Sequence, residues 1–181
     1  MSKTFSWPWQ YSFPPFFTMQ PNSDTRSKQV NVWCDLVLEY FKANKNYILD
    51  VNEAQTSPLF CNSAINRKLS TDGIVLILLE LEKRGNLEWQ DKQKSRCLVM
   101  WRTPSEWGKL VYKWAVDSGL ANSVCTLYEI HSGADTTSEE FSNIEPWMLK
   151  KTILALQSEG KAEYIHGINP DDSDAGVKFF T

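Results

Sequence analysis

Apolar residues in the first half of the chain recur every three or four positions in separate blocks, which is the spacing of helices with one buried face. The predicted helices begin near Asp24, at Pro58 and at a cap on Ser70 or Thr71. The last of them is rich in Ile and Leu and ends at Gly85, because glycine suits the left-handed backbone that follows a helix. Short strands are predicted at residues 47–49, 87–89 and 98–101, the last two forming a hairpin.

The second half of the chain shows the same order of blocks. Thr103-Pro104-Ser105-Glu106 marks a helix start, since Thr and Glu can satisfy free backbone amides and Pro is tolerated at the first helical position. Residues 107–114 continue this helix with an apolar face. Further along, we predict a strand at 124–126, a short helix at 127–131, an acidic loop at 133–140, a helix capped by Ser142 or Asn143 and ending at Gly160, and a hairpin of 162–165 with 177–180.

The two halves also match residue by residue. Residues 33–40 resemble residues 107–114 at four apolar positions, 74 residues apart. Residues 78–89 resemble residues 153–164 at a separation of 75, with glycine at the same place in both. Two matches in the same order at nearly the same separation indicate an internal duplication.

Helix, strand, helix, helix and hairpin is the order of the winged-helix fold. The prediction is therefore an α+β, mainly helical chain with two tandem winged-helix domains, residues 24–103 and 104–181. Each domain is large enough for a compact core. An extended aromatic and proline-rich segment, residues 1–23, precedes them.

This N-terminal segment is the most unusual part of the sequence. Seven of the thirteen residues from 5 to 17 are aromatic, including Trp7, Trp9, Phe16 and Phe17, and Pro14-Pro15 stiffens the chain. Rigid aromatic side chains are typical anchors of protein interfaces, which favours docking onto a partner. The alternative is that the rings fold back and complete the core of the first domain, and both can hold for different rings.

Charge and composition bear on a second function class, nucleic-acid binding in a transcription or other complex. Residues 1–103 carry 13 Lys/Arg and 10 Asp/Glu, whereas residues 104–181 carry 6 and 12, a net charge of −6. Neither predicted third helix is basic, and the best feature for DNA is the short run of Lys92, Lys94 and Arg96. We therefore expect no specific nucleic-acid binding, and a mobility-shift assay at low salt would test this.

The sequence carries few residues suited to catalysis or metal binding. The four cysteines lie far apart and are expected as free thiols in a reducing, cytoplasmic compartment. No phosphate loop, nucleophile elbow or metal-ligand pair is present, so no catalytic residue, metal, cofactor or small-molecule substrate is predicted. The longest aliphatic run, residues 74–79, is far shorter than a membrane span.

Two charged groups remain as candidate contacts. Lys83 and Arg84 complement the negative end of their helix, and they can also pair with acids on a partner. Asp171, Asp172 and Asp174 lie in the last predicted hairpin loop, where they are either solvated surface or steer a basic partner toward the second domain.

The N-terminal motif gives a more specific lead. Residues 7–21, read as Trp7-Pro8-Trp9-x-Tyr11-x-Phe13-Pro14-Pro15-Phe16-Phe17-Thr18-x-Gln20-Pro21, closely resemble the N-terminus of the small two-copy subunits of the endosomal sorting complex ESCRT-II. Ser57-Pro58-Leu59-Phe60, Gly85-Asn86-Leu87-Glu88-Trp89 and Glu106-Trp107-Gly108-Lys109-Leu110 resemble later parts of that family. The resemblance covers essentially the whole chain.

The resemblance implies a non-enzymatic scaffold that sorts ubiquitinated cargo into multivesicular bodies. It implies that Pro14 to Phe17 dock onto the other two ESCRT-II subunits, and that the second winged helix recruits the initiating subunit of ESCRT-III. Membrane association is then peripheral, at endosomes, and indirect. Residues 168–176 form a longer wing loop than the family leads us to expect, so no contact is carried over to that loop.

Overall fold

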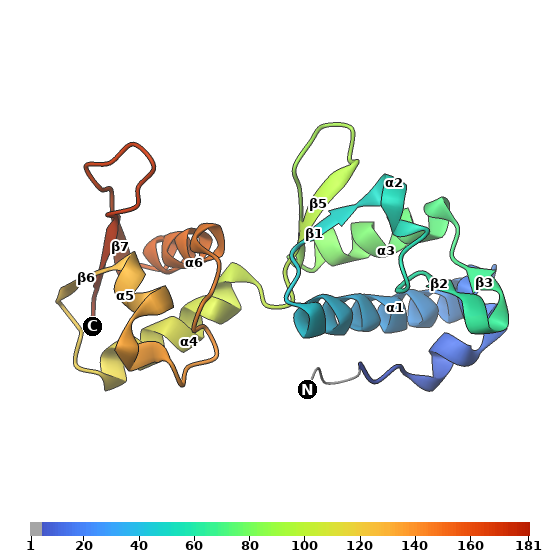
Figure 1. Ribbon diagram of the computed structural model, residues 1–181, viewed down its shortest axis with the longest axis horizontal. Coiled ribbons are helices and arrows are strands. Elements are labelled where there is room, and N and C mark those ends of the chain that lie inside the picture. The colour runs from blue at the N-terminus through green and yellow to red at the C-terminus, as the bar shows by residue number, and fades with distance from the viewer. Residues whose placement is uncertain (1–4) are drawn as a thin grey trace. The chain divides into compact units, whose positions relative to one another are not determined.

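The computed structural model describes residues 5–181, and these form two compact units that divide between Trp101 and Arg102. The first four residues of the expected docking segment lie outside this description. The remainder of that segment belongs to unit 1 by its contacts, and Figure 1 shows it running alongside α1 (Ser23–Asn44). Each unit has the winged-helix order of helix, strand, helix, helix and hairpin.

Unit 1 places three helices against a small antiparallel sheet. Its strands run in the order β1-β5-β4, with Ile48 opposite Leu98 and Leu87 opposite Val99. The elements after α1 are β1 (Ile48–Asp50), α2 (Val51–Ala54), β2 (Cys61–Asn62), η3 (Ser63–Ile65), β3 (Arg67–Lys68), α3 (Thr71–Lys83), β4 (Leu87–Trp89) and β5 (Arg96–Val99).

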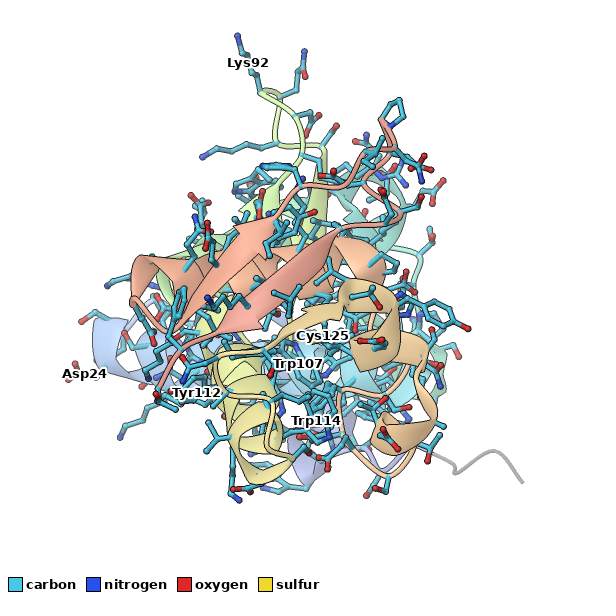
Figure 2. The ribbon with its side chains drawn as sticks, turned by 90° about the vertical axis from the view of Figure 1, so that its left-hand side faces the viewer. Asp24, Lys92, Trp107, Tyr112, Trp114 and Cys125 are labelled. Carbon is cyan, nitrogen blue, oxygen red and sulfur yellow. The ribbon has the colours of Figure 1, made fainter. Side chains whose placement is uncertain are left out.

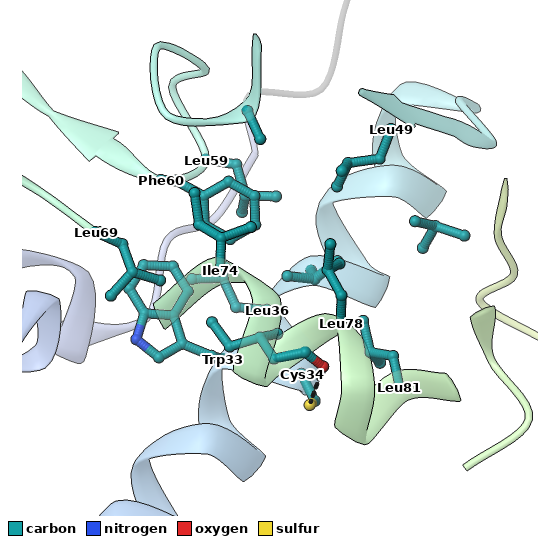
Figure 3. Packing of buried hydrophobic residues seen from close by; sticks show 14 of the residues in the cluster. Trp33, Cys34, Leu36, Leu49, Leu59, Phe60, Leu69, Ile74, Leu78 and Leu81 are labelled. Carbon is teal, nitrogen blue, oxygen red and sulfur yellow. Dashed lines mark hydrogen bonds between the residues drawn. The ribbon is translucent and has the colours of Figure 1, made fainter. Parts of the chain in front are cut away.

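The core of unit 1 lies where α1 crosses α3. Trp33, Ile74 and Leu78 are fully buried there, and Figure 3 shows the indole of Trp33 beside Ile74 with Leu69 and Phe60 around it. Cys34 brings the helices close, because its small Sγ atom lies 3.7 Å from the carbonyl oxygen of Ile77 and donates to it. Burial of this many large apolar side chains is the main source of the unit's stability.

Unit 2 repeats this plan. Its sheet has the order β6-β8-β7, and Val124 lies opposite Lys178 while Ala162 lies opposite Phe179. Its elements are α4 (Pro104–Asp117), β6 (Val124–Thr126), α5 (Leu127–Ser132), η4 (Ala134–Thr136), α6 (Pro146–Ser158), β7 (Ala162–Ile165) and β8 (Gly176–Phe179).

The helix crossing in unit 2 also depends on a small residue. Gly108 takes the place that Cys34 has in unit 1, and a Cβ there would come within 3.2 Å of Leu156 on α6. Figure 2 shows Trp107 and Trp114 on α4, where both are buried and Trp114 meets Phe141 edge-on at 5.7 Å. The paired positions 33 and 107 are thus buried tryptophans in both units, which agrees with the predicted duplication.

Several helix boundaries differ from the prediction. The predicted helix at Pro58 is wrong, because the short helix of unit 1 is α2, capped by Asp50, which accepts a bond from Asn52 N at 2.9 Å. Residues 57–60 form turns instead, since Leu59 and Phe60 are adjacent and both buried rather than spaced along one helical face.

The predicted caps are partly correct. Ser70 caps α3 and Thr103 caps α4, each through its side-chain oxygen. The cap of α1 is Asn22 rather than Asp24, which lies within the first turn. The cap of α6 is Glu145 rather than Ser142 or Asn143, because Pro146 occupies the first helical position and fixes the start of the helix.

Candidate docking surface

The aromatic N-terminal segment packs onto unit 1 through part of its rings. Phe16 lies parallel to the indole of Trp33 at 4.2 Å between ring centres, and Phe17 meets the same indole edge-on at 5.4 Å. Only 5% of Phe16 and 3% of Phe17 is exposed. In the chain by itself both rings therefore belong to the core of unit 1, as the alternative interpretation of the aromatic segment expected, and their docking onto a partner stays a prediction.

Polar groups fasten the backbone of the same segment. The Trp33 indole donates to the carbonyl oxygen of Phe16 at 2.9 Å. The buried amide of Gln29 donates to the carbonyl oxygens of Phe16 and Thr18 at 2.9 and 2.8 Å, and it accepts from the backbone N–H of Gln20 at 3.1 Å. A buried amide needs such partners, so Gln29 binds the segment while remaining satisfied itself.

Tyr11 provides the second attachment. Its ring is buried and stacks on Trp7 at 3.8 Å, and Trp7 is half-buried. The Tyr11 hydroxyl donates to the carbonyl oxygens of Pro58 and Cys61, and burial raises its pKa. Asn62 Nδ2 donates to the Tyr11 carbonyl oxygen at 2.7 Å. The segment is therefore held at both of its short helices, η1 (Trp9–Ser12) and η2 (Pro14–Phe17).

The other rings of the segment face outward. Trp9 is 70% exposed and Phe13 is 48% exposed, with their ring centres 5.7 Å apart. Pro14 and Pro15 are also exposed. The rings of Trp9 and Phe13 line an apolar groove of about 380 Å³ together with Pro15 and Val32. Sequence reasoning named Trp9 and both prolines but missed Phe13, although the aromatic run itself contained it.

Lys83 and Arg84, the expected basic pair, have different surroundings. Arg84 joins α3 to α1, because its guanidinium donates to Asn31 Oδ1 at 2.7 Å and lies 3.4 Å from Asp35 and 3.7 Å from Glu80. Lys83 is exposed and lines a separate polar groove of about 350 Å³ that also contains Arg26. A direct partner contact therefore fits Lys83 better than Arg84.

The wing of unit 2 is the acidic loop between β7 and β8, and its own carboxylates fix its conformation. Asp174 accepts from the backbone N–H groups of Ile168 and Asn169 at 2.8 and 3.1 Å, and these bonds lower its pKa. Asp172 accepts from Tyr164 Oη at 3.1 Å and from Gly167 N at 3.2 Å. Asp172 and Asp174 thus shape the loop.

Asp171 makes fewer bonds within the loop than Asp172 and Asp174. It is exposed and accepts from Ser173 N at 3.0 Å. In the other wing, Figure 2 shows Lys92 at the tip of the loop, where its side chain is solvated. Of the predicted set, Asp171 and Asp174 are thus exposed and Asp172 is half-buried.

The remaining reactive groups are poorly suited to chemistry. Burial raises the pKa of Cys34 and of Cys97 to about 12 and that of Cys125 to about 11, so these thiols are protonated and unreactive near neutral pH. Across residues 5–181, no group of three or more His, Cys, Asp or Glu side chains is arranged to hold a metal ion. Within the same described range, no helix combines the length and apolarity that a bilayer crossing requires.

Comparison with known proteins agrees with the resemblance. The family model described as "ESCRT-II complex subunit" matches residues 10–145. The chain is 58% identical to vacuolar protein-sorting-associated protein 25 of Danio rerio over 177 residues, covering 98% of this chain and 99% of that protein. It is 52% identical to the Homo sapiens protein of the same name over 180 residues, covering 99% and 100%.

Solved structures support the same relationship. The crystal structure of subunit VPS25 of the endosomal trafficking complex ESCRT-II has a TM-score of 0.78 at 29% identity, covering 95% of this chain and 97% of that one. The VPS22/VPS25/VPS36 complex of ESCRT-II also contains a similar chain, with a TM-score of 0.74, 29% identity and coverage of 95% and 98%. Fold, sequence and length all agree, and this chain belongs to the family of ESCRT-II complex subunits.

Proposed function

We propose that this chain is a non-enzymatic scaffold subunit of ESCRT-II that assembles with a VPS22-like and a VPS36-like subunit. The observation that carries the proposal is its near-full-length similarity to VPS25 proteins, one of which was solved in a complex with VPS22 and VPS36. Its role is then in endosomal sorting of ubiquitinated cargo into multivesicular bodies, with peripheral rather than integral attachment to the endosome.

The exposed half of the N-terminal segment is the proposed assembly site. Trp9 and Phe13 present two neighbouring rings to solvent, whereas Phe16 and Phe17 secure the segment to the domain beneath. Large exposed aromatic side chains on a stiff backbone match the anchors of protein interfaces. Pro14 and Pro15 complete this surface, and Lys83 is a secondary contact to an acid on a partner.

The test is binding of the purified chain to co-expressed VPS22-like and VPS36-like subunits, measured by titration calorimetry. Replacing Trp9 and Phe13 with alanine is expected to remove about 2–4 kcal/mol of binding free energy per anchor, a factor of roughly 30 to 1000. The thermal midpoint should change little, because Trp9 is 70% and Phe13 48% exposed. Ile168→Ala is the matched control, since that side chain is 96% exposed in unit 2. Equal affinity of wild type and the double variant would contradict the assigned surface.

Unit 2 is the proposed recruiter of the initiating ESCRT-III subunit. Its net charge of −6 supports attraction of a basic partner, although exposed charges contribute mainly to the association rate. Asp171 is the wing acid best placed for this role, because it is exposed and accepts one bond within the loop, whereas Asp172 and Asp174 each accept two or more. A slower association of Asp171→Asn at low salt would support steering by the wing.

A further inference from the structure

Ser57 and Pro58 begin the turn that follows α2, and they form one of the two Ser/Thr-Pro pairs in the sequence. Pro58 is exposed, and Ser57 is half-buried and lines an open groove of about 930 Å³. In the second pair, Thr103-Pro104, both residues are half-buried and the threonine caps a helix of 14 residues. Proline-directed protein kinases require a serine or threonine followed by proline. Ser57 is therefore the better-placed acceptor for a phosphate.

The turn that begins at Ser57 is also the attachment point of η1. The Ser57 carbonyl oxygen accepts from Phe60 N at 3.1 Å and from Cys61 N at 2.9 Å. The backbone folded in this way supplies the carbonyl oxygens of Pro58 and Cys61 to the Tyr11 hydroxyl. A change at Ser57 can therefore reach the N-terminal segment through this turn.

The surroundings of Ser57 disfavour an added negative charge. The groove that it lines contains two acids, Asp50 and Glu53, and one cation, Lys45. Ser57 N donates to the carbonyl oxygen of Ala54 at 3.0 Å, so the serine lies at the C-terminal, partly negative end of α2. A phosphate adds a charge of about −1.5 to −2 near neutral pH, and beside carboxylates or at a helix C-terminus it is disruptive.

Unit 2 has a glycine where unit 1 has this serine. The strand and short helix β1–α2 match β6–α5 at a separation of 76, at which Asn52 matches Tyr128 and Ser57 matches Gly133. Glycine has no hydroxyl, so this place in unit 2 cannot be phosphorylated. The acceptor is therefore present in the unit whose core includes the aromatic segment.

We propose that Ser57 is a phosphorylation site and that its modification releases the N-terminal segment from unit 1. A proline-directed kinase transfers the γ-phosphoryl group of ATP. The phosphorus forms a bond to Ser57 Oγ, its bond to the bridging oxygen of ADP breaks, and the hydroxyl proton passes to the catalytic carboxylate of the kinase.

Two effects of the phosphate then act on the turn. Ser57 Oγ accepts from Leu59 N at 3.2 Å in the unmodified chain, and a bulky ester at this oxygen weakens that bond. Asp50 and Glu53 also repel the new charge. The turn opens, and the Tyr11 hydroxyl loses both of its carbonyl acceptors.

Access of the kinase requires local opening of the same turn. Leu59 and Phe60 are each 1% exposed, and Figure 3 shows both among the buried side chains of unit 1. Turns open transiently in folded proteins, and a phosphate added in the open state hinders reclosure. Both consequences are measured on the chain alone, so the inference stands apart from the proposed assembly. Under that assembly, it places the segment that carries Trp9 and Phe13 under regulation.

The first experiment incubates the purified full chain with a proline-directed kinase, ATP and Mg²⁺, and locates the phosphate by tandem mass spectrometry. Phosphate is expected on Ser57. Ser57→Ala should lose most of the incorporated phosphate, whereas Thr103→Ala should keep it. Phosphate on Thr103 alone, or on neither residue, overturns the site.

The second experiment compares hydrogen exchange in the phosphorylated and unmodified chains. Amides of residues 11–18 should exchange about tenfold or more faster after phosphorylation, while those of unit 2 should not change. Ser57→Glu should act in the same direction but less strongly, because it adds one charge rather than about two. Gln93→Glu is the matched control, since it adds one charge to the exposed loop between β4 and β5 and should exchange as wild type does. Equal exchange in the phosphorylated and unmodified chains overturns release of the segment.

Discussion

The two winged helices of this chain share one framework but complete their cores differently. In unit 1 the indole of Trp33 is covered by Phe16 and Phe17, which come from outside the repeated part of the sequence. In unit 2 the matching Trp107 faces the guanidinium of Arg102 at 5.6 Å, close to it in the sequence. Unit 1 therefore depends on an added segment for its stability, whereas unit 2 is closed by its own residues.

This difference separates framework from function. The positions that match between the units are buried or conformationally restricted, such as the pair Val37 and Val111, both fully buried. Some of the positions that differ are exposed in both units, such as Asn52 and Tyr128. A duplicated domain can thus keep its interior while each copy acquires its own partner surface.

The largest expected loss of stability comes from a change in the N-terminal segment, which only unit 1 uses. Phe17→Ala should destabilise unit 1 by about 3–5 kcal/mol, because it removes a buried ring that packs on Trp33. Hydrogen exchange followed by mass spectrometry should show the loss of protection in unit 1 alone. Phe13→Ala is the matched control, at 48% exposure, with an expected change within about 0.5 kcal/mol. Equal protection in both variants would mean that the segment does not support the core.

A smaller loss of stability, of equal size in the two units, is expected at the C-terminal ends of α3 and α6. Gly85 and Gly160 follow α3 and α6 with φ of 82° and 72°, a conformation that costs an L-residue about 1–2 kcal/mol. Gly85→Ala and Gly160→Ala should therefore lower the stability of their own units by similar amounts. For Gly160 the cost is strain alone, since no atom lies within 4 Å of an added Cβ. Unequal losses, measured as local exchange free energies, would show that the two helix ends are not equivalent.

The smallest expected effect concerns the wings at acid pH. Backbone N–H groups of Ile168 and Asn169 lower the pKa of Asp174, and the Ser95 hydroxyl is the main cause of the lowered pKa of Asp91 in unit 1. A lowered folded-state pKa gives stability that is present above the ordinary aspartate pKa and is lost as pH falls through the folded value. NMR spectra should keep the loop shifts of Ile168 and Ser95 above about pH 4 and lose them below it. A midpoint at higher pH would refute this account of the loops.

Much of the framework could be predicted from the sequence because periodic apolar patterns and glycines identify long helices. The strands at Leu87–Trp89, Val124–Thr126 and Ala162–Ile165 agree with their predictions. The small hairpin of β2 and β3 could not be predicted, since each strand has two residues and the turn depends on a left-handed Asn66. Strands that short leave no periodic signal.

The docking surface was harder to predict than the fold. Alternation along an extended segment does not reveal which rings face inward, because Trp9 and Phe16 are both aromatic and both adjoin prolines. Gln29 carried a usable signal, since it is a polar residue one helical turn before Trp33 on the buried face of α1. The exposure of Tyr128 depends on the short helix α5 and its capping box. The sequence from Thr126 to Glu129 already has the residues that such a box requires.

The N-terminal segment is both part of a core and part of an exposed surface, so the proposed assembly would couple partner binding to protein turnover. Under the proposed assembly, a partner that holds Trp9 and Phe13 also holds Phe16 and Phe17 against Trp33, so occupancy stabilises unit 1 by mass action. A partner present at a hundred times its dissociation constant adds about 2.7 kcal/mol. Unassembled copies lack this added stability. Their N-terminal segment therefore detaches from unit 1 more often and exposes Trp33 and its neighbours to proteases. The cell would then remove surplus subunits first, and the amount of this chain would follow the amount of its partners.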